Sequence, residues 1–302
     1  MLNSSEKLKV LKILDNILKL EKNDNEALIK LQREMVSKIA ARFMPLYSKS
    51  DGKQGFVSIQ RDPFKEDLQS LLHYARFNRE AGANIMAKIP VTKEGLEALE
   101  ILIAERVPIN ATEVMAVKQA LDVCEIYQRI IKSMKDPAPI YFSHITGIYD
   151  EYLKKTVEKN GIEISDDILW QSGISIAKKI YWIVKEKGYP VGFIGGGARG
   201  LHYFTEMVGS DCCITINWKG TADVLLEQNP PVIQRFFQPT PDSVIDSLLK
   251  KVEDYRKAYF INGLKQEEYE DFGPILYFRK MFKEAWINCL NFIKNRRIEI
   301  GL

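Results

Sequence analysis

The sequence predicts an α/β fold built around a parallel sheet. Short apolar segments alternate with longer amphipathic segments through the middle of the chain. Continuously apolar strands are typical of parallel sheets that helices cover on both faces. Connections through the intervening helices are right-handed and place such strands side by side. We therefore expect alternating strands and helices, with further helices at both ends.

Six segments are predicted to be strands, because each is short, apolar and bounded by turn formers. They cover residues 56–60, 85–89, 108–114, 140–145, 190–194 and 212–217. Helical spacing of apolar residues predicts helices at residues 63–77, 93–105, 116–132, 168–187 and 201–208. Thr92 has the residue type and position of an N-cap for the second of these helices.

The two ends of the chain are predicted to be helical. Helices are expected at residues 4–21 and 25–43, with capping residues at 23–25. From residue 242 onward the chain is expected to be wholly helical, and Pro274 opens its last long segment. We expect a single domain over residues 1–302, with N-terminal helices in 1–50, a core in 55–218 and a C-terminal helical extension in 242–302.

Composition narrows the class of protein. The 302 residues include 46% hydrophobic and 27% charged residues, which is ordinary for a globular enzyme. A net charge of +3 without a basic block gives no reason to expect nucleic-acid binding. The sequence has neither an apolar run of membrane-spanning length nor a signal-peptide pattern. Cysteines 124, 212, 213 and 289 lack metal-ligand spacing, so we expect reduced thiols in a cytoplasmic protein without a metal.

Lys88 lies inside an apolar strand, in the segment NIMAKIPVT, directly before Pro90. A buried ammonium is costly, and a desolvated lysine becomes a neutral amine nucleophile suited to Schiff-base chemistry. A lysine near the end of a strand is therefore a candidate catalyst. The alternative is a lysine that extends to water or pairs with a carboxylate.

The glycine-rich segment GGGARG, residues 195–200, follows a predicted strand and precedes a predicted helix. Its spacing satisfies the dinucleotide fingerprint, but only one further strand follows, and Asp211 comes early for the ribose-binding acid. A second interpretation is a phosphate site to which Arg199 adds a forked donor. A third is a tight turn that needs glycine for its backbone.

Three polar residues lie near the carboxyl ends of apolar strands, as Lys88 does: Gln60, Thr112 and Ser143. Each is explained either as a core residue bonded to nearby backbone or as part of a site. In barrels, catalytic groups come from this end of the strands.

The segments NIMAKIPVTKEGLEAL, PINATEVMAVKQAL, IGGGARG and CITI, in this order and spacing, resemble the transaldolase family, near its fructose 6-phosphate aldolase branch. The resemblance covers residues 55–218, and the C-terminal helices look like the tail of longer bacterial members. It implies a (β/α)₈ TIM barrel without metal or organic cofactor. A strand lysine forms an imine with a ketose, the C3–C4 bond breaks, and the bound dihydroxyacetone enamine attacks an acceptor aldehyde.

The resemblance also implies roles for single residues. Lys88 falls on the Schiff-base lysine, and Thr112 on the threonine that helps position the catalytic water. Asn110 falls on an asparagine that contacts the substrate, Ser143 on a serine near the sugar, and Arg199 on the phosphate-binding arginine. The implied function is transfer of a dihydroxyacetone unit between sugar phosphates in carbohydrate metabolism of the pentose phosphate type.

Several residues depart from the family pattern. Gln60 stands where transaldolases have a glutamate. The aldolase branch also has glutamine at this position, so we expect Gln60 to take part in a changed water-activating step. Gly147-Ile148 replaces a Gly-Arg pair, so one of two phosphate-binding arginines is missing, and Gly197 replaces a serine. A sulfonated or unphosphorylated sugar is therefore an alternative substrate.

Family members also begin with two strands that this sequence lacks, one carrying an acid/base aspartate and the other a substrate-binding asparagine. We therefore expect an incomplete barrel of six strands, with little or no turnover by this chain alone. A misplaced start is the favoured explanation, and a complementing chain or a degenerate protein are the others; a homo-oligomer is a further expectation. The rival functions are a non-catalytic protein that binds sugar phosphates or a partner, and a nucleotide-dependent oxidoreductase.

Overall fold

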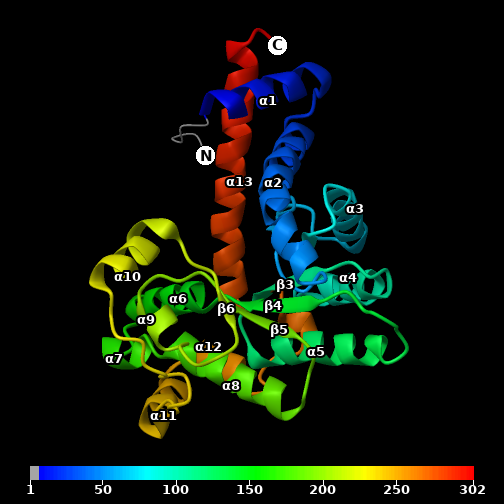
Figure 1. Cartoon of the computed structure of the whole chain (residues 1–302). Helices are drawn as coiled ribbons and strands as arrows, with labels where there is room; N and C mark the ends of the chain where they lie inside the picture. The colour runs from blue at the N-terminus through cyan, green and yellow to red at the C-terminus, as the bar shows by residue number, and fades with distance from the viewer. Residues whose placement is uncertain (1–6) are drawn as a thin grey trace. The chain divides into compact units, whose positions relative to one another are not determined.

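The predicted α/β fold is confirmed by a computed structural model, which describes residues 7–302 (Figure 1). Within these residues, six strands form one sheet in chain order. They are β1 (Val57–Ile59), β2 (Ile85–Pro90), β3 (Ile109–Val114), β4 (Ile140–His144), β5 (Gly192–Gly195) and β6 (Cys213–Ile214). The strand pairs run parallel, as the predicted crossovers require. Since a closed barrel of this type has eight strands, the sheet agrees with the predicted incomplete (β/α)₈ barrel.

Helices connect and flank the strands. They are α1 (Lys7–Leu20), α2 (Asp24–Lys49), α3 (Leu68–Arg79), α4 (Lys93–Ala104), α5 (Val117–Ile131), α6 (Thr146–Asn160), α7 (Asp166–Leu169), α8 (Ser172–Glu186), α9 (His202–Thr205), α10 (Asp223–Gln228), α11 (Asp242–Lys251), α12 (Glu253–Tyr259) and α13 (Gly273–Glu299). In the described part of the chain, none of them is long and apolar enough to cross a membrane.

The chain divides into two compact units, one of residues 1–88 and 279–302 and the other of residues 89–278. The boundary falls inside β2, between Lys88 and Ile89, and again inside α13. Residues 4–6, where the first predicted helix begins, lie outside the described residues. A single domain over residues 1–302 stays a prediction.

Helices supply the core of the first unit. Leucines of α1 and α2 pack with Trp286 and Ile293 of α13, and Figure 1 shows α2 running beside the C-terminal part of α13. Arg296 binds both carboxylate oxygens of Asp15 at 2.8 Å. Forked arginine–carboxylate pairs of this kind are geometrically specific, so the pair holds α13 in register with α1.

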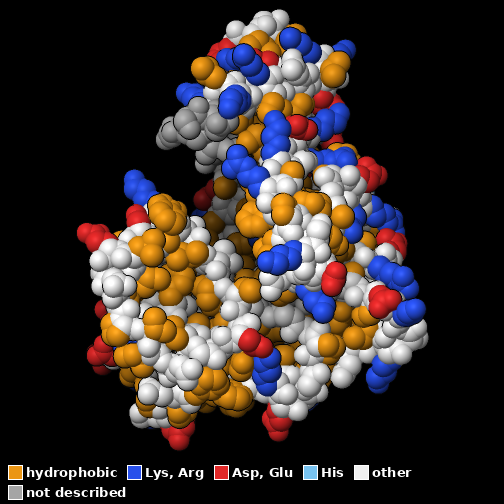
Figure 2. All heavy atoms as spheres, in the orientation of Figure 1, with side chains coloured by type: hydrophobic (Ala, Val, Ile, Leu, Met, Phe, Trp, Pro, Cys, Tyr) orange, Lys and Arg blue, Asp and Glu red, His pale blue; other side chains and the backbone are white. Residues whose placement is uncertain are grey.

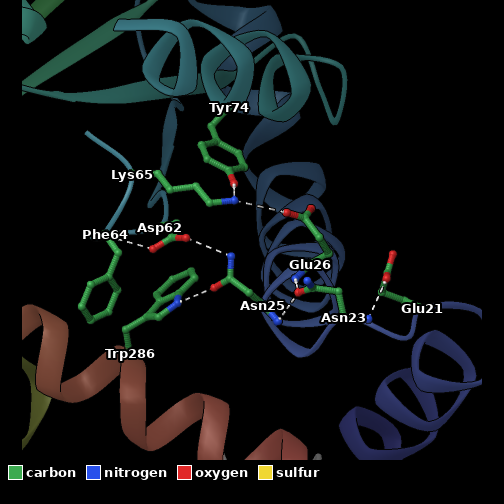
Figure 3. Close-up of polar contacts among 9 residues, drawn as sticks. All are labelled: Glu21, Asn23, Asn25, Glu26, Asp62, Phe64, Lys65, Tyr74 and Trp286. Atoms are coloured by element: carbon green, nitrogen blue, oxygen red, sulfur yellow. Dashed lines mark hydrogen bonds and ion pairs between the residues drawn. The ribbon is translucent and has the colours of Figure 1, made fainter. Parts of the chain in front are cut away.

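A polar network fixes the chain directly after Gln60 (Figure 3). The Asn25 amide donates to Asp62 Oδ2 at 2.9 Å, and Trp286 Nε1 donates to Asn25 Oδ1 at 2.9 Å. The other oxygen of Asp62 accepts from the N–H of Phe64 at 2.9 Å. Asp62 is only 3% exposed, and a buried carboxylate is costly without donors. The network therefore holds the segment that follows β1 against α2 and α13.

The second unit is built on β3 to β6. The strands bury Ile109, Ala111 and Phe142 completely, and helices α4 and α5 pack against them. Thr92 caps α4 as predicted, since its hydroxyl oxygen accepts from the N–H of Gly95 at 3.1 Å. That cap fixes the turn between the end of β2 and α4.

Several elements differ from the prediction. Helix α2 continues through Pro45 to Lys49, and α3 begins only at Leu68, where Asp67 caps it. Helices α6 and α10 were not predicted, and β6 has two residues where six were expected. The predicted wholly helical C-terminal region is interrupted between α12 and α13, where the structure has only a 3₁₀ turn at Gln266–Glu268.

Hydrophobic side chains are exposed on the second unit around α10. Trp218, Leu226 and Val232 are 70%, 66% and 88% exposed, and Figure 2 shows hydrophobic side chains gathered over this part of the surface. Exposed apolar patches of this kind are typical of interaction surfaces.

Candidate active site

Lys88 and Gln60 lie at the same end of neighbouring strands. Val57, Ser58 and Ile59 of β1 pair in order with residues 85–87 of β2. Lys88 follows the last paired residue of β2, and Gln60 follows the last paired residue of β1. Lys88 is half-buried, and the residues on either side of it, Ala87 and Ile89, are 3% and 1% exposed. The predicted nucleophile therefore lies on β2, and the predicted water-activating residue directly follows the end of the neighbouring strand β1.

Asn110 on β3 and Ser143 on β4 are in direct contact. Ser143 Oγ donates to Asn110 Oδ1 at 2.7 Å, and the two side chains are 7% and 6% exposed. This hydrogen bond turns the oxygen of the Asn110 amide toward Ser143, so the NH₂ group points away from β4. The structure thus brings together two residues that the sequence predicts to bind substrate.

Thr112 lies two residues after Asn110 on β3. Its hydroxyl is buried and makes no hydrogen bond within residues 7–302. A buried hydroxyl without a partner costs about 1–3 kcal/mol, and a ligand or ordered water usually satisfies such a group. Thr112 is therefore suited to hold a water molecule, as the resemblance implies.

Sequence reasoning missed Glu113, which stands beside these residues. It is fully buried and has a φ of 64°, a left-handed conformation that is uncommon outside glycine. The register between β3 and β4 shifts between Ala111 and Val114, so Glu113 belongs to an irregularity of the strand. Bulges and strained residues concentrate next to active sites, where they redirect side chains. No property of the local sequence indicates this conformation.

The glycine segment after β5 serves as a close-packed turn. Gly197 has a φ of 64°, and a Cβ on Gly147 would lie 2.0 Å from the carbonyl oxygen of Gly197. The loop therefore packs directly against the first turn of α6. The helix that follows, α9, has only four residues and begins at His202. A dinucleotide motif needs a long helix that starts at the loop, so the structure favours the tight-turn interpretation.

Arg199 of this loop contacts a carboxylate that the sequence did not indicate. Arg199 Nε lies 3.0 Å from Glu151 Oε2, and Nη1 donates to the carbonyl oxygen of Gly197 at 3.2 Å. Arg199 also lines a cavity of about 480 Å³, together with Lys154, Trp170 and Tyr203. Among residues 7–302, its polar contacts do not include Asn110 or Ser143.

A second missed carboxyl, Asp150, reaches the same cavity. Burial raises the pKa of Asp150 to about 7, although the hydroxyls of Ser172 and Tyr203 and the N–H of Gly173 all donate to it. Since Ser172 and Gly173 begin α8, Asp150 caps that helix. This contact gives it a structural role beside the cavity.

His144 ends β4, the strand that carries Ser143, and it is completely buried. Its two ring nitrogens face the carbonyl oxygens of Val114 at 2.9 Å and Gly173 at 3.3 Å. Burial lowers the pKa of His144 to about 4, although both carbonyl contacts favour the charged ring. The neutral imidazole has one N–H and donates to only one of these carbonyl oxygens, while the buried ring lies between the ends of β3 and β4 and the start of α8.

Comparison with known proteins places the chain in a family. The family model described as transaldolase/fructose-6-phosphate aldolase matches residues 2–262. The chain belongs to this family. A transaldolase of Helicobacter pylori is 29% identical over 176 residues, which are 57% of this chain and 52% of that protein. A transaldolase of Neisseria gonorrhoeae is 28% identical over 138 residues, 45% of this chain and 39% of that protein.

Family membership confirms the resemblance that the strand motifs carried. The chain spans about half the length of the curated relatives it matches. The family supports an enzyme of the aldolase and transferase kind. The roles of single residues in this chain are proposals.

Proposed function

We propose that the chain transfers a dihydroxyacetone unit from a ketose to an aldehyde through an imine on Lys88. Membership of the transaldolase/fructose-6-phosphate aldolase family over residues 2–262 carries this proposal. The place of Lys88 on β2, where the buried Met86 lies two positions earlier on the same face of the strand, supports its role. Imine formation needs an unprotonated amine as the nucleophile.

The other polar residues complete the proposed chemistry. The Asn110 amide, oriented by Ser143, binds hydroxyl groups of the ketose. The Thr112 hydroxyl holds the water through which the carbinolamine loses its oxygen, and Gln60 orients the same step from β1. The protonated imine then accepts the electron pair of the breaking C3–C4 bond.

Sugar phosphates are the substrates that the family suggests, with Arg199 at their phosphate end. We also propose that the protein is cytoplasmic and acts in carbohydrate metabolism of the pentose phosphate type. We propose further that it assembles with a second copy or with a complementing chain. The absence of a cofactor also stays a prediction.

A second candidate function is binding of sugars without turnover. Gln60 favours it, because an amide cannot take up a proton in the way the glutamate of transaldolases can. The two candidates differ in whether a covalent intermediate forms on Lys88.

Reduction with borohydride in the presence of dihydroxyacetone tests the proposal. We expect the intact mass to rise by dihydroxyacetone minus one oxygen atom, once per chain, in the unmodified protein and in Lys93→Met, an exposed lysine of α4. Lys88→Met should remain unmodified while still folded by circular dichroism. An unmodified wild-type protein, or equal modification of Lys88→Met, would contradict the proposal.

A further inference from the structure

A cavity of about 670 Å³ lies on the second unit, where α8 meets α12 and the turn that follows it (Figure 1). Lys179 of α8 lines it, together with Arg256 and Lys257 of α12. Phe260 and Ile261 of the turn form its apolar side. Cavities of this size hold small molecules, and cationic walls raise the local concentration of anions. The lining therefore indicates a small ligand with negative charge.

The ammonium of Lys179 has no carboxylate partner among residues 7–302. It lies 3.7 Å from the ring centre of Tyr259 and 5.6 Å from that of Phe260. The side chain is half-buried, and burial lowers the pKa of Lys179. Aromatic faces compensate only part of the loss of water around a cation, and an anion compensates more of it. The charge of Lys179 is therefore stabilised when an anion enters the cavity.

The other lysines of α8 differ from Lys179 in this respect. Lys178 Nζ lies 3.7 Å from a carboxylate oxygen of Glu206, and Lys185 Nζ lies 2.5 Å from one of Asp211. Within the described chain, Lys179 is thus the lysine of this helix whose charge faces aromatic rings instead of a carboxylate. A lysine that served only to fix the helix would be expected to have such a partner.

Arg256 adds a second cation with open donors. Its Nη1 donates to the carbonyl oxygen of Leu249 at 3.0 Å, while Nε and Nη2 make no hydrogen bond to another residue of 7–302. Lys257 is paired with Glu253 at 2.9 Å, and Glu253 also lines the cavity. Since that pair balances itself, Lys179 and Arg256 leave an excess of positive charge, which a phosphate group would neutralise.

The apolar side of the cavity indicates what else the ligand carries. Phe260 and Ile261 are 45% and 42% exposed, and both border the space next to the cations. An inorganic phosphate would leave these side chains in water. A ligand with an anionic group and a flat or apolar part would cover them as well, and nucleobases stack on aromatic rings of this kind.

We infer that this cavity binds a small organic phosphate, with its phosphate group on Lys179 and Arg256 and its organic part against Phe260. The inference goes beyond the proposed aldol function and does not depend on it. Its test involves neither a ketose nor Lys88, so its failure would leave the proposed function untouched.

Calorimetry with adenosine 5′-monophosphate and with inorganic phosphate tests the site. We expect the wild type to bind the nucleotide more tightly, because its base stacks on Phe260. Lys179→Met should weaken both ligands at least about tenfold, the size of effect typical for a lost charge-assisted contact. Phe260→Leu should weaken the nucleotide alone.

Lys187→Met is the matched control. Lys187 is exposed, and its ammonium lies 5.8 Å from the ring centre of Tyr189, so the variant removes the same charge from beside a tyrosine. It should leave both affinities unchanged. Lys179→Arg keeps the charge and should bind both ligands as the wild type does.

Urea unfolding separates binding from a structural role of Lys179. Methionine also packs on the ring of Tyr259 and carries no half-buried charge, so Lys179→Met should keep or raise the free energy of unfolding. A less stable variant with unchanged affinities would show that Lys179 only holds α12 on α8, and would overturn the inference. Absence of binding by the wild type, or an equal loss in Lys187→Met, would also overturn it. Equal affinity for nucleotide and phosphate would overturn the role of Phe260.

Discussion

Ser143 on β4 donates a hydrogen bond to the amide oxygen of Asn110 on β3 at 2.7 Å. Both side chains are buried, so the bond is shielded from water and sets which way the Asn110 amide faces. The substrate-binding role proposed for Asn110 therefore depends on a residue of the next strand.

Replacing Ser143 by alanine should slow dihydroxyacetone trapping more than it lowers the stability of the fold. Without the donor, the Asn110 amide loses its orientation, and we expect the rate of dihydroxyacetone trapping to fall about tenfold, equivalent to about 1.4 kcal/mol. Ser133→Ala, at an exposed position after α5, should keep the wild-type rate. An unchanged rate in Ser143→Ala would show that the hydrogen bond does not orient a functional group.

Replacing Thr112 by valine should slow the trapping reaction without lowering the free energy of unfolding. Because its hydroxyl has no hydrogen-bond partner among the described residues, its removal should leave the free energy of unfolding unchanged or raise it by up to about 1 kcal/mol. The trapping rate should fall at least about tenfold if that hydroxyl holds the water.

Thr92→Val provides the contrast, since it removes a hydroxyl that caps α4 and should cost about 1 kcal/mol of stability. Urea unfolding of both variants gives the comparison. A loss of stability in Thr112→Val like that in Thr92→Val would indicate that Thr112 has a structural role.

The buried ring of His144 should make stability depend on pH. Its pKa is about 4 in the folded protein and about 6.5 when exposed, so the unfolded chain binds a proton between these values that the folded chain excludes. Stability from this group is present above pH 6.5 and is lost as the pH falls toward 4, by about 3 kcal/mol in total.

His144→Gln does not titrate, and its amide has two N–H donors for the carbonyl oxygens of Val114 and Gly173. Between pH 7.5 and 4 the wild type should therefore lose about 3 kcal/mol more unfolding free energy than the variant in urea titrations. Parallel curves for the two proteins would mean that His144 titrates normally in the folded state.

The strands and their capped helices were predictable because their signals are local. The apolar run around Lys88 and the N-cap Thr92 indicate β2 and α4 without reference to other parts of the chain. Helix α6 was not predicted, since it has Gly147 in its first turn and, beyond that turn, buries only Leu153 and Val157. Glycine is needed there because the loop after β5 approaches its backbone, a long-range contact that local sequence does not show.

The residues of the candidate site were likewise predictable only where the signal is local. The strand positions of Lys88, Asn110, Thr112 and Ser143 follow from the two-residue period and the motifs that carry the family resemblance. The contact between Arg199 and Glu151 joins residues 48 positions apart, and the sequence shows only an isolated arginine after glycines. The conformation of Glu113 likewise depends on the pairing of β3 with β4.

The central claim is that Lys88 forms the carbon–nitrogen bond with the ketose. Protein labelled with ¹⁵N at the lysine side chains, reduced with borohydride in the presence of [2-¹³C]dihydroxyacetone, tests it most directly by NMR. The account predicts one ¹³C–¹⁵N coupled pair in the wild type and in Lys93→Met, and none in Lys88→Met. Absence of the coupled pair from the wild type, or its persistence in Lys88→Met, would contradict the account.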